Sequence, residues 1–457
     1  MPKKITDTCG IIMMAGMGTR MVSEHPKVLH EACGKPMGWW VLDSCDRAGL
    51  VSRVIVVGHH ANEVKVAFPS EKHVLQKPQK GTGHAVMVGM KEVPKECSQV
   101  MVLSGDVPCL GDETIRQLIE IHRKVKSSAT VLSFFPPDPS GYGRIIRNKK
   151  NEVEGIIEDK DLSGEQREIE ECNSGIYVFD REFLEKALKK IKPSERSGEY
   201  HLPDVLKFML ETGGTVIGAA TPLWIEATGV NTRLELSEAA DYLKWRIAKA
   251  HMEKGVTIIA PSATWIGPEV KIGKDSIIHP GTIIMGKCTI GTGTSIGPYS
   301  ELHEVKIGNN CNIRHSVLSE SRIDDDVKIG PYAHIRPGTR IRTGAKVGNF
   351  VEMKKTDFGK GSKSGHLTYL GDAEVGDDVN VGAGTITCNY DGKKKHKTVI
   401  GNGVFIGSDS ILVAPIKIGK NSYTAAGSTL NQDVPDNSLA FGRARQIVKK
   451  GWIKKKK

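Results

Sequence analysis

The chain of 457 residues is 39% hydrophobic and carries a formal net charge of +11. This length predicts two or three domains with packed cores, and the positive charge suits small polyanionic ligands, with nucleic acid or a solvated basic tail as alternatives. No stretch approaches the ~20 apolar residues of a membrane-spanning helix, and the apolar run at 11–15 is too short for a signal peptide. The nine cysteines contain no C-x-x-C pair, which argues against a zinc site or a disulfide framework. We expect a cytoplasmic protein with reduced thiols.

A glycine loop follows the first predicted strand. The strand covers residues 10–15, and the loop covers residues 16–20. Backbone N–H groups of such a loop can face an anion, and glycine lets phosphates approach closely. The loop has neither the third glycine of a dinucleotide fingerprint nor the Gly-Lys-Ser/Thr of a Walker loop. Arg20 and Lys27 add two cations, which favours a triphosphate ligand over the alternative of an ordinary turn with surface charges.

Strands are also predicted at 51–58 and 99–103, and a small-residue loop opens a helix at Gly81. Asp106 follows the third strand, at the edge where open α/β sheets bind ligands. A carboxylate there is a natural Mg²⁺ ligand beside phosphates, although a helix cap is the alternative. The alternation of strands and helical segments predicts a doubly wound α/β domain.

Two polar residues further along could bond sugar hydroxyls. Glu158 and Asn173 lie next to apparent strands, although each could equally be a satisfied loop residue. The domain ends near Asn231, and the apolar spacing from Thr232 to about Glu253 predicts a linking helix.

A six-residue repeat occupies the chain from residue 266 to about 427. An aliphatic residue followed by glycine returns in phase, as at Ile266-Gly267, Ile272-Gly273 and Ile406-Gly407. This period fits neither a helix nor a hairpin and is typical of a parallel β-helix. One aliphatic side chain per hexad would point inward, and Gly, Asn or Asp would occupy the corners because they tolerate positive φ. A flexible glycine-rich region is disfavoured because Val and Ile recur in phase.

Residues 336–390 break the repeat, and chemistry on a coil must come from such residues. His366 lies in this segment, and an imidazole with an ordinary pKa of about 6.5 can accept a proton near neutral pH. A structural histidine is the alternative. The polar insertion at 393–395 predicts a loop that leaves the coil.

Together these motifs resemble the GlmU family, in which an N-acetylglucosamine-1-phosphate uridyltransferase is fused to a glucosamine-1-phosphate N-acetyltransferase. The likeness runs from about residue 10 to Arg443. Its carriers are residues 15–20, 26–30, 81–85, 105–108 and 141–144, and in the coil residues 336–338, 347–355, 365–372 and 382–392. Two departures stand out. Met13 and Met14 replace the usual Leu-Ala, and Ser104 stands where the family often has Tyr, which puts a sugar or uracil contact in doubt.

The resemblance implies a Rossmann-like nucleotidyltransferase domain at 1–231, a linker helix at 232–255, and a left-handed parallel β-helix of hexapeptide repeats with a basic tail at 256–457. It implies acetyl transfer from acetyl-CoA to glucosamine 1-phosphate, then uridylyl transfer from UTP to N-acetylglucosamine 1-phosphate with release of pyrophosphate. The product, UDP-N-acetylglucosamine, is a precursor of peptidoglycan and lipopolysaccharide. A homotrimer with acetyltransfer sites between subunits is also implied, with no nucleic-acid or membrane partner.

The resemblance further assigns residues to two sites. The uridine–sugar site would comprise Met14, Ala15, Gly16, Lys27, Gln76, Gly81, Thr82, Gly143, Glu158, Asn173 and Asn231, with Arg20 and Lys27 catalytic and with Asp106 and Asn231 holding Mg²⁺. In the coil, His366 would be the general base. The sugar phosphate would contact Arg336, Lys354, Tyr369 and Asn380, and acetyl-CoA would contact Ala383, Asn389, Tyr390, Ser408, Ala426 and Arg443.

Three alternatives remain. A monofunctional sugar-1-phosphate nucleotidyltransferase with a structural β-helix would have no constellation of His366, Asn389 and Tyr390. A metal-binding coil would need several histidines at close spacing, which His303, His315, His334 and His366 do not give. A non-catalytic scaffold is disfavoured by the presence of Arg20, Lys27, Asp106 and His366.

Overall fold

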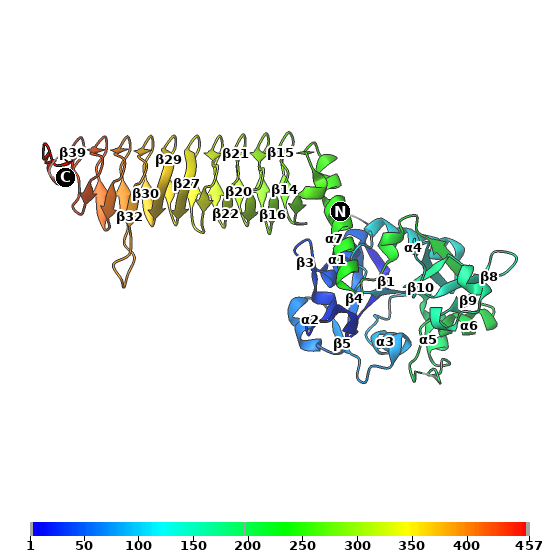
Figure 1. Cartoon of the computed structure of the whole chain (residues 1–457). Coiled ribbons are helices and arrows are strands. Elements are labelled where there is room, and N and C mark those ends of the chain that lie inside the picture. The colour runs from blue at the N-terminus through cyan, green and yellow to red at the C-terminus, as the bar shows by residue number, and fades with distance from the viewer. Residues whose placement is uncertain (1–2, 196, 454–457) are drawn as a thin grey trace. The chain divides into compact units, whose positions relative to one another are not determined.

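The computed structural model describes residues 3–195 and 197–453 of the chain (Figure 1). The chain divides into two compact units, Met1–Leu243 and Lys244–Lys457. The division falls inside helix α7 (Arg233–Met252), where the linking helix was predicted. No helix among the described residues is long and apolar enough to cross a membrane.

The first unit is built on a sheet with the order β11-β7-β10-β6-β1-β4-β5. Its strands are β1 (Ile5–Met14), β4 (Leu50–Val57), β5 (His73–Leu75), β6 (Gln99–Ser104), β7 (Ala129–Phe134), β10 (Cys172–Asp180) and β11 (Val216–Ala220). The predicted strands at 10–15, 51–58 and 99–103 are confirmed as β1, β4 and β6. β1 pairs in parallel with β4 and β6, and the doubly wound α/β prediction is confirmed.

β10 is antiparallel to both β6 and β7, which the sequence did not indicate. A parallel strand needs a crossover connection. β10 instead follows the antiparallel hairpin of β8 (Arg144–Arg147) and β9 (Val153–Ile157), with only short 3-10 turns between β9 and β10. The chain therefore returns to the sheet in the opposite direction.

Helices cover both faces of this sheet because alternate strand residues point to opposite sides. Ile12 of β1 packs with α1 (Met37–Ala48), α2 (Ala61–Ala67) and α4 (Asp112–Val125), and Ile11 packs with α3 (Gly81–Met90), α5 (Arg181–Leu188) and α6 (Asp204–Glu211). Smaller elements are β2 (Glu31–Ala32), β3 (Lys35–Pro36) and the 3-10 turns Thr19–Met21, Lys27–Leu29, Asp159–Asp161, Glu165–Glu168, Trp224–Ala227 and Pro261–Ala263.

The second unit is the predicted parallel β-helix, which Figure 1 shows as a stack of short strands. One sheet comprises β14 (Lys271–Ile272), β17 (Thr289–Ile290), β20 (Lys306–Ile307), β23 (Arg322–Ile323), β26 (Arg340–Ile341), β28 (Asp357–Phe358), β30 (Ala373–Val375), β33 (Thr398–Ile400) and β36 (Ile416–Ile418). Each strand pairs in parallel with its equivalent one coil later, as Ile290 does with Ile307. The stacked aliphatic residues are buried in one continuous core.

The remaining strands form a second sheet that covers the other faces of the coil. They are β12 (Thr257–Ile258), β13 (Trp265–Ile266), β15 (Ile277–Ile278), β16 (Ile283–Met285), β18 (Ser295–Ile296), β19 (Glu301–His303), β21 (Asn312–Ile313), β22 (Val317–Ser319), β24 (Lys328–Ile329), β25 (His334–Ile335), β27 (Lys346–Lys354), β29 (Lys363–Gly371), β31 (Asn380–Val381), β32 (Ile386–Cys388), β34 (Phe405–Ile406), β35 (Ile411–Val413), β37 (Tyr423–Thr424), β38 (Thr429–Leu430) and β39 (Leu439–Ala440). β27 and β29 are unusually long because each runs through a corner.

The corners differ from the expected Gly, Asn or Asp along one edge of the coil. Tyr299, His315, Tyr332, Phe350 and Leu367 all have positive φ there. These five residues are called the corner stripe below. Neighbouring rings contact each other from Tyr299 to Phe350, and the rings of Tyr332 and Phe350 lie 5.5 Å apart and nearly parallel.

The predicted loop at 393–395 is confirmed. It leaves the coil between β32 and β33, as Figure 1 shows, and Tyr390 and Lys395 form an antiparallel bridge at its base.

Two candidate catalytic sites

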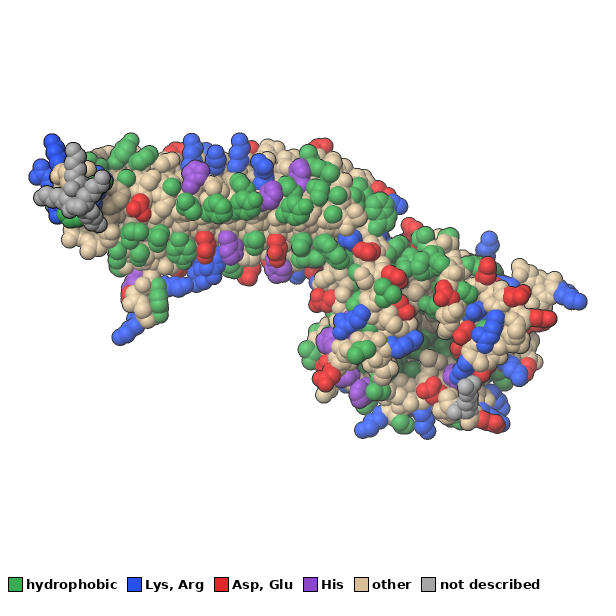
Figure 2. Space-filling model, viewed as in Figure 1, with side chains coloured by type: hydrophobic (Ala, Val, Ile, Leu, Met, Phe, Trp, Pro, Cys, Tyr) green, Lys and Arg blue, Asp and Glu red, His purple; other side chains and the backbone are tan. Residues whose placement is uncertain are grey.

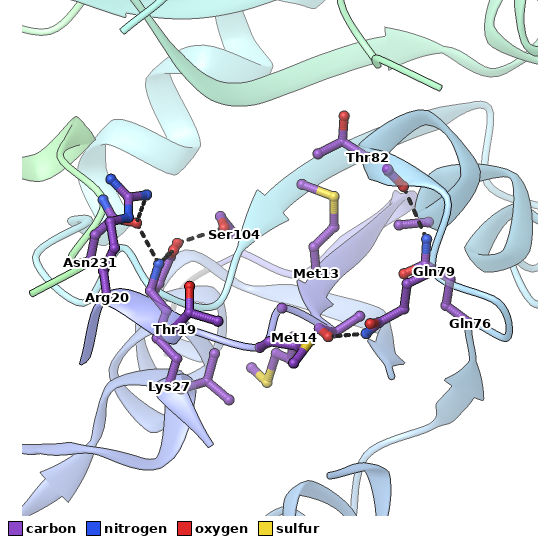
Figure 3. Close-up of a pocket in the computed structure, with 18 of the residues that line it drawn as sticks. Met13, Met14, Thr19, Arg20, Lys27, Gln76, Gln79, Thr82, Ser104 and Asn231 are labelled. Atoms are coloured by element: carbon purple, nitrogen blue, oxygen red, sulfur yellow. Dashed lines mark hydrogen bonds and ion pairs between the residues drawn. The ribbon is translucent and has the colours of Figure 1, made fainter. Parts of the chain in front are cut away.

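A cavity of about 570 Å³ lies at the carboxyl end of β1 in the first unit (Figure 3). The glycine loop, the start of α3 and the end of β6 surround it. Its lining includes Met13, Met14, Ala15, Gly16, Met17, Gly18, Thr19, Arg20, Lys27, Val28, Gln76, Gln79, Gly81, Thr82, Ala85, Ser104, Asp106, Glu199 and Asn231. This position is the ligand-binding edge of an α/β sheet.

The glycine loop can take its shape only with glycine at residue 18. Gly18 has φ of +66°, and a Cβ there would lie 2.6 Å from Cβ of Lys27. The loop thus turns tightly over Lys27 and directs that side chain to the cavity. Gly16 has open space around it, which leaves room for a ligand at the cavity wall.

Charged and polar side chains converge on Lys27 at one end of the cavity. Its Nζ atom contacts Oδ2 of Asp106 and lies 2.8 Å from Oδ1 of Asn231. Arg20 donates to the same Asn231 oxygen at 2.9 Å, and Oγ of Ser104 donates to Oδ1 of Asp106 at 2.6 Å. The figure shows Lys27, Arg20, Asn231 and Ser104 grouped at this end (Figure 3).

The backbone holds the two oxygen-bearing residues together. The N–H of Val230 donates to the carbonyl of Asp106 at 2.8 Å, so the loop of Asn231 is fixed to the end of β6. Nδ2 of Asn231 donates to the carbonyl of Gly229 at 3.1 Å, which turns Oδ1 toward the cavity. Two oxygens from distant parts of the sequence therefore converge on one cation, here the ammonium group of Lys27.

Three residues predicted for this site lie outside the cavity lining. The carbonyl of Gly143 accepts from the N–H of Asn173 at 2.8 Å, and Oδ1 of Asn173 accepts from the Tyr177 hydroxyl at 3.0 Å. Glu158 follows β9, and burial raises the pKa of its carboxyl. These three residues form a separate group on β8–β10.

Two lining residues, Gln79 and Glu199, lie outside all the motifs identified in the sequence and were not predicted. Gln79 donates from Nε2 to the carbonyl of Ala15, and its place two residues before the loop predicted at Gly81 was an available signal. Glu199 is far away in the sequence. It reaches the cavity because the next carbonyl, that of Tyr200, accepts from the N–H of Gly83 at 2.8 Å, and no sequence pattern indicated this contact.

In the coil, the residues predicted for acetyl-CoA follow His366 along one corner. The N–H of Gly384 donates to Leu367 at 2.9 Å, and that of Gly427 donates to Ser408 at 2.9 Å. The residues just before these corners are His366, Ala383, Ser408 and Ala426, on four successive coils. Nη1 of Arg443 then donates to the carbonyl of Ala426 at 2.7 Å. The structure brings these residues into one line.

The residues predicted for the sugar phosphate are grouped less tightly. Arg336 pairs with Glu352 at 2.6 Å, and Glu352 lies opposite Tyr369 in the pairing of β27 and β29. Lys395 and then Arg336 lower the pKa of Lys354, so positive charge gathers here. Asn380 pairs instead with Lys363, on the other side of the corner that contains His366.

Asn389 and Tyr390 lie at the base of the loop that leaves the coil. Asn389 is buried and donates to Oδ2 of Asp372 at 2.5 Å, whereas Tyr390 is exposed and donates to the carbonyl of Gly392 at 2.7 Å. N–H groups of the loop and His396 lower the pKa of Asp391, which stabilises this turn. Among the described residues, no three His, Cys, Asp or Glu side chains of one chain could share a metal ion.

Comparisons with known proteins cover both units. The family model of a MobA-like NTP transferase domain matches residues 10–142, and that of a bacterial transferase hexapeptide matches residues 269–304 and 397–432. "Bifunctional protein GlmU" of Thermoanaerobacter pseudethanolicus is 48% identical over 98% of this chain and 97% of its own length. The proteins of the same name from Caldanaerobacter subterraneus and Fervidobacterium nodosum are 47% and 49% identical, each over 98% of this chain and 97% of their own length.

Proposed function

This chain belongs to the family of bifunctional GlmU proteins, and we propose that each of its two units contains one of the two catalytic sites. It is an enzyme of UDP-N-acetylglucosamine biosynthesis that transfers acetyl to glucosamine 1-phosphate and then uridylyl to N-acetylglucosamine 1-phosphate. Its coil is a left-handed parallel β-helix of hexapeptide repeats. Residues 1–231 and 256–457 would each contain one site, with residues 232–255 between them.

The cavity at the end of β1 is proposed as the uridylyl-transfer site. An oxygen of the sugar 1-phosphate attacks the α-phosphorus of UTP, and the bond to the leaving pyrophosphate breaks. No covalent intermediate is required, so positioning and charge neutralisation provide the catalysis. Arg20 and Lys27 would neutralise phosphate charge, and N–H groups beside Gly16 would bind phosphate oxygens. Gly143, Glu158 and Asn173 would contact a sugar that extends beyond the cavity lining.

The oxygen pair of Asp106 and Asn231 suits a divalent metal in this metal-dependent family, and we propose Mg²⁺. Both oxygens are hard donors, and magnesium beside phosphates takes one or two carboxylates and keeps waters. Both already converge on a positive group, since Lys27 lies between them. Bound there, the ion would neutralise charge on the phosphates. In its presence Lys27 would turn to the ligand, because the glycine loop above it leaves open space at Gly16.

The line of corner residues that begins at His366 is proposed as the acetyl-transfer site, and this line carries the proposal. The 2-amino group attacks the thioester carbon of acetyl-CoA, His366 accepts the proton of the amine, and coenzyme A leaves as its thiol or thiolate. Arg336, Lys354, Tyr369 and Asn380 would hold the sugar phosphate. Coenzyme A would lie along Ala383, Ser408 and Ala426 toward Arg443, with Asn389 and Tyr390 beside it.

We also propose a cytoplasmic homotrimer in which the corner stripe contacts a neighbouring copy. Tyr299, Tyr332, Phe350 and Leu367 are each more than half exposed, and Figure 2 shows apolar side chains running along the coil. Contiguous exposed apolar surface of this kind marks an interaction site. Leu367 directly follows His366, so a copy that covers the stripe would border the acetyl-transfer site.

Thiol release from acetyl-CoA with glucosamine 1-phosphate tests this proposal, with wild type compared to His366→Ala. Thiol release should collapse in the variant while pyrophosphate release from UTP and N-acetylglucosamine 1-phosphate survives. Equal thiol release by both proteins would remove His366 from the reaction. No release by the wild type would leave a uridyltransferase on a structural coil.

A further inference from the structure

We infer that Asn349 is a positioning residue that fixes the ring orientation and tautomer of His366; the inference rests on the proposed acetyl transfer. Nδ1 of His366 lies 2.5 Å from Oδ1 of Asn349. The two residues are direct partners in the parallel pairing of β27 and β29, 17 positions apart in the sequence. None of the assignments above gives Asn349 a role.

The backbone on both coils builds this contact. A Cβ at Gly348 would lie 1.9 Å from the carbonyl oxygen of Gly365, so the two strands approach closely just before the pair. Phe350 and Leu367, which follow the pair, both have positive φ, of 58° and 44°. The two strands β27 and β29 therefore turn in the same direction at paired positions. The side chains of Asn349 and His366 leave the coil side by side for this reason.

The opposite side of the ring has no comparable partner. The corner position on the next coil is Ala383, whose methyl group cannot form a hydrogen bond, and Gly384 aligns that coil by donating to Leu367. Among the described residues, only Asn349 has a side chain that hydrogen-bonds the His366 ring. Thr368 fixes the backbone by donating from Oγ1 to the His366 carbonyl at 2.8 Å. One side of the ring is thus held, and the other is left for substrate.

This arrangement selects the tautomer that a general base needs. A neutral imidazole has one N–H, and an amide oxygen beside Nδ1 accepts that N–H. Nε2 then keeps its lone pair and can take the proton of the attacking amine. When His366 becomes an imidazolium, the bond from Nδ1 to Asn349 is retained. Because the partner is a neutral amide, it orients the ring without placing a second charge beside it.

The test is acetyl-transfer kinetics of the full chain with three substitutions. Asn349→Leu keeps the side-chain size and removes the acceptor, so kcat should fall roughly 10- to 100-fold, less than the ~10²- to 10⁴-fold that a general base itself contributes. The KM values of both substrates should stay within about twofold, because the residue contacts neither. Asn349→Ala should behave alike, and Asn349→Asp should restore most of kcat because its carboxylate accepts from Nδ1–H.

A ¹⁵N NMR spectrum of the His366 ring reports which ring nitrogen carries the proton. If Asn349 had only a structural role, its substitution would not change this tautomer. Wild type should show the Nδ1–H form, and Asn349→Leu should show a shift toward Nε2–H. Pyrophosphate release from UTP is the control for folding, because the first unit performs it. Wild-type kcat or an unchanged spectrum in Asn349→Leu would overturn the inference alone. No thiol release by the wild type would overturn the proposed function and the inference with it.

Discussion

Oγ of Ser104 lies 2.6 Å from Oδ1 of Asp106, while the other oxygen of that carboxylate contacts Lys27. Ser104 stands where the family often has tyrosine, and its hydroxyl holds the carboxylate in one orientation. We expect Ser104→Ala to raise the Mg²⁺ concentration needed for half-maximal uridylyl transfer about tenfold. Loss of a residue that orients a metal ligand lowers metal affinity by about this factor. Titration of pyrophosphate release against Mg²⁺ measures this. Acetyl transfer should not change, and an unaltered Mg²⁺ titration would show that the hydroxyl does not orient Asp106.

Gly348 and Gly365 form a matched pair for testing the close approach of β27 and β29. A Cβ on Gly348 would meet the Gly365 carbonyl at 1.9 Å, whereas a Cβ on Gly365 would meet nothing within 4 Å. Gly348→Ala should destabilise the coil by about 1–3 kcal/mol or more, as overpacking does. Gly365→Ala should unfold close to wild type. Thermal unfolding compares the two, and equal loss in both would contradict the pairing in this register.

The pH dependence of stability should reveal His122, a buried residue of α4. Its Nδ1 lies 3.0 Å from the hydroxyls of both Ser127 and Thr130, and burial, opposed in part by Asp180, lowers the pKa of His122 to about 4. The unfolded chain, with a histidine pKa near 6.5, binds this proton first. His122 should therefore not lower the free energy of unfolding of the first unit above pH ~6.5. Below that pH, the free energy of unfolding should fall by up to about 3 kcal/mol as the pH approaches 4.

His122→Gln keeps a polar side chain among the same hydroxyls and cannot titrate. Denaturant unfolding of wild type and His122→Gln at several pH values measures the difference. The variant should be less stable at neutral pH but lose less stability between pH ~6.5 and 4, because the ionising group is gone. Parallel pH profiles for the two proteins would show that His122 does not titrate in this range.

The sequence predicted those features that depend on local pattern. The buried runs of β1, β4 and β6 and the hexad of the coil are periodic, and both were found. β5 has only three residues, too few to show a period. The antiparallel direction of β10 depends on the hairpin before it, which no single segment encodes. The resemblance to a known family, and not a local pattern, assigned most of the site residues, and the majority of them line the cavity or the corner of His366.

What could not be predicted depends on register between distant segments. Asn349 meets His366 only because the two coils pair at that position. The hexad repeat is broken in this segment, so the sequence does not show which residues of neighbouring coils are paired. Glu199 reaches the cavity through a backbone contact of its neighbour. The bulky corner residues were also unexpected, because positive φ favours glycine, and stacking of Tyr332 on Phe350 offsets part of that cost.

The corner stripe predicts that oligomerisation and acetyl transfer are coupled. Tyr332→Ser with Phe350→Ser removes two exposed, stacked rings and should shift the protein from the proposed trimer toward monomer, because the apolar area that a second copy would cover is lost. Light scattering after gel filtration measures the mass. Val66→Ser with Phe135→Ser removes two exposed apolar side chains from the first unit and should leave the trimer intact. Acetyl transfer should fall together with the trimer while uridylyl transfer continues. A trimeric stripe variant would show that the copies meet on another face of the coil.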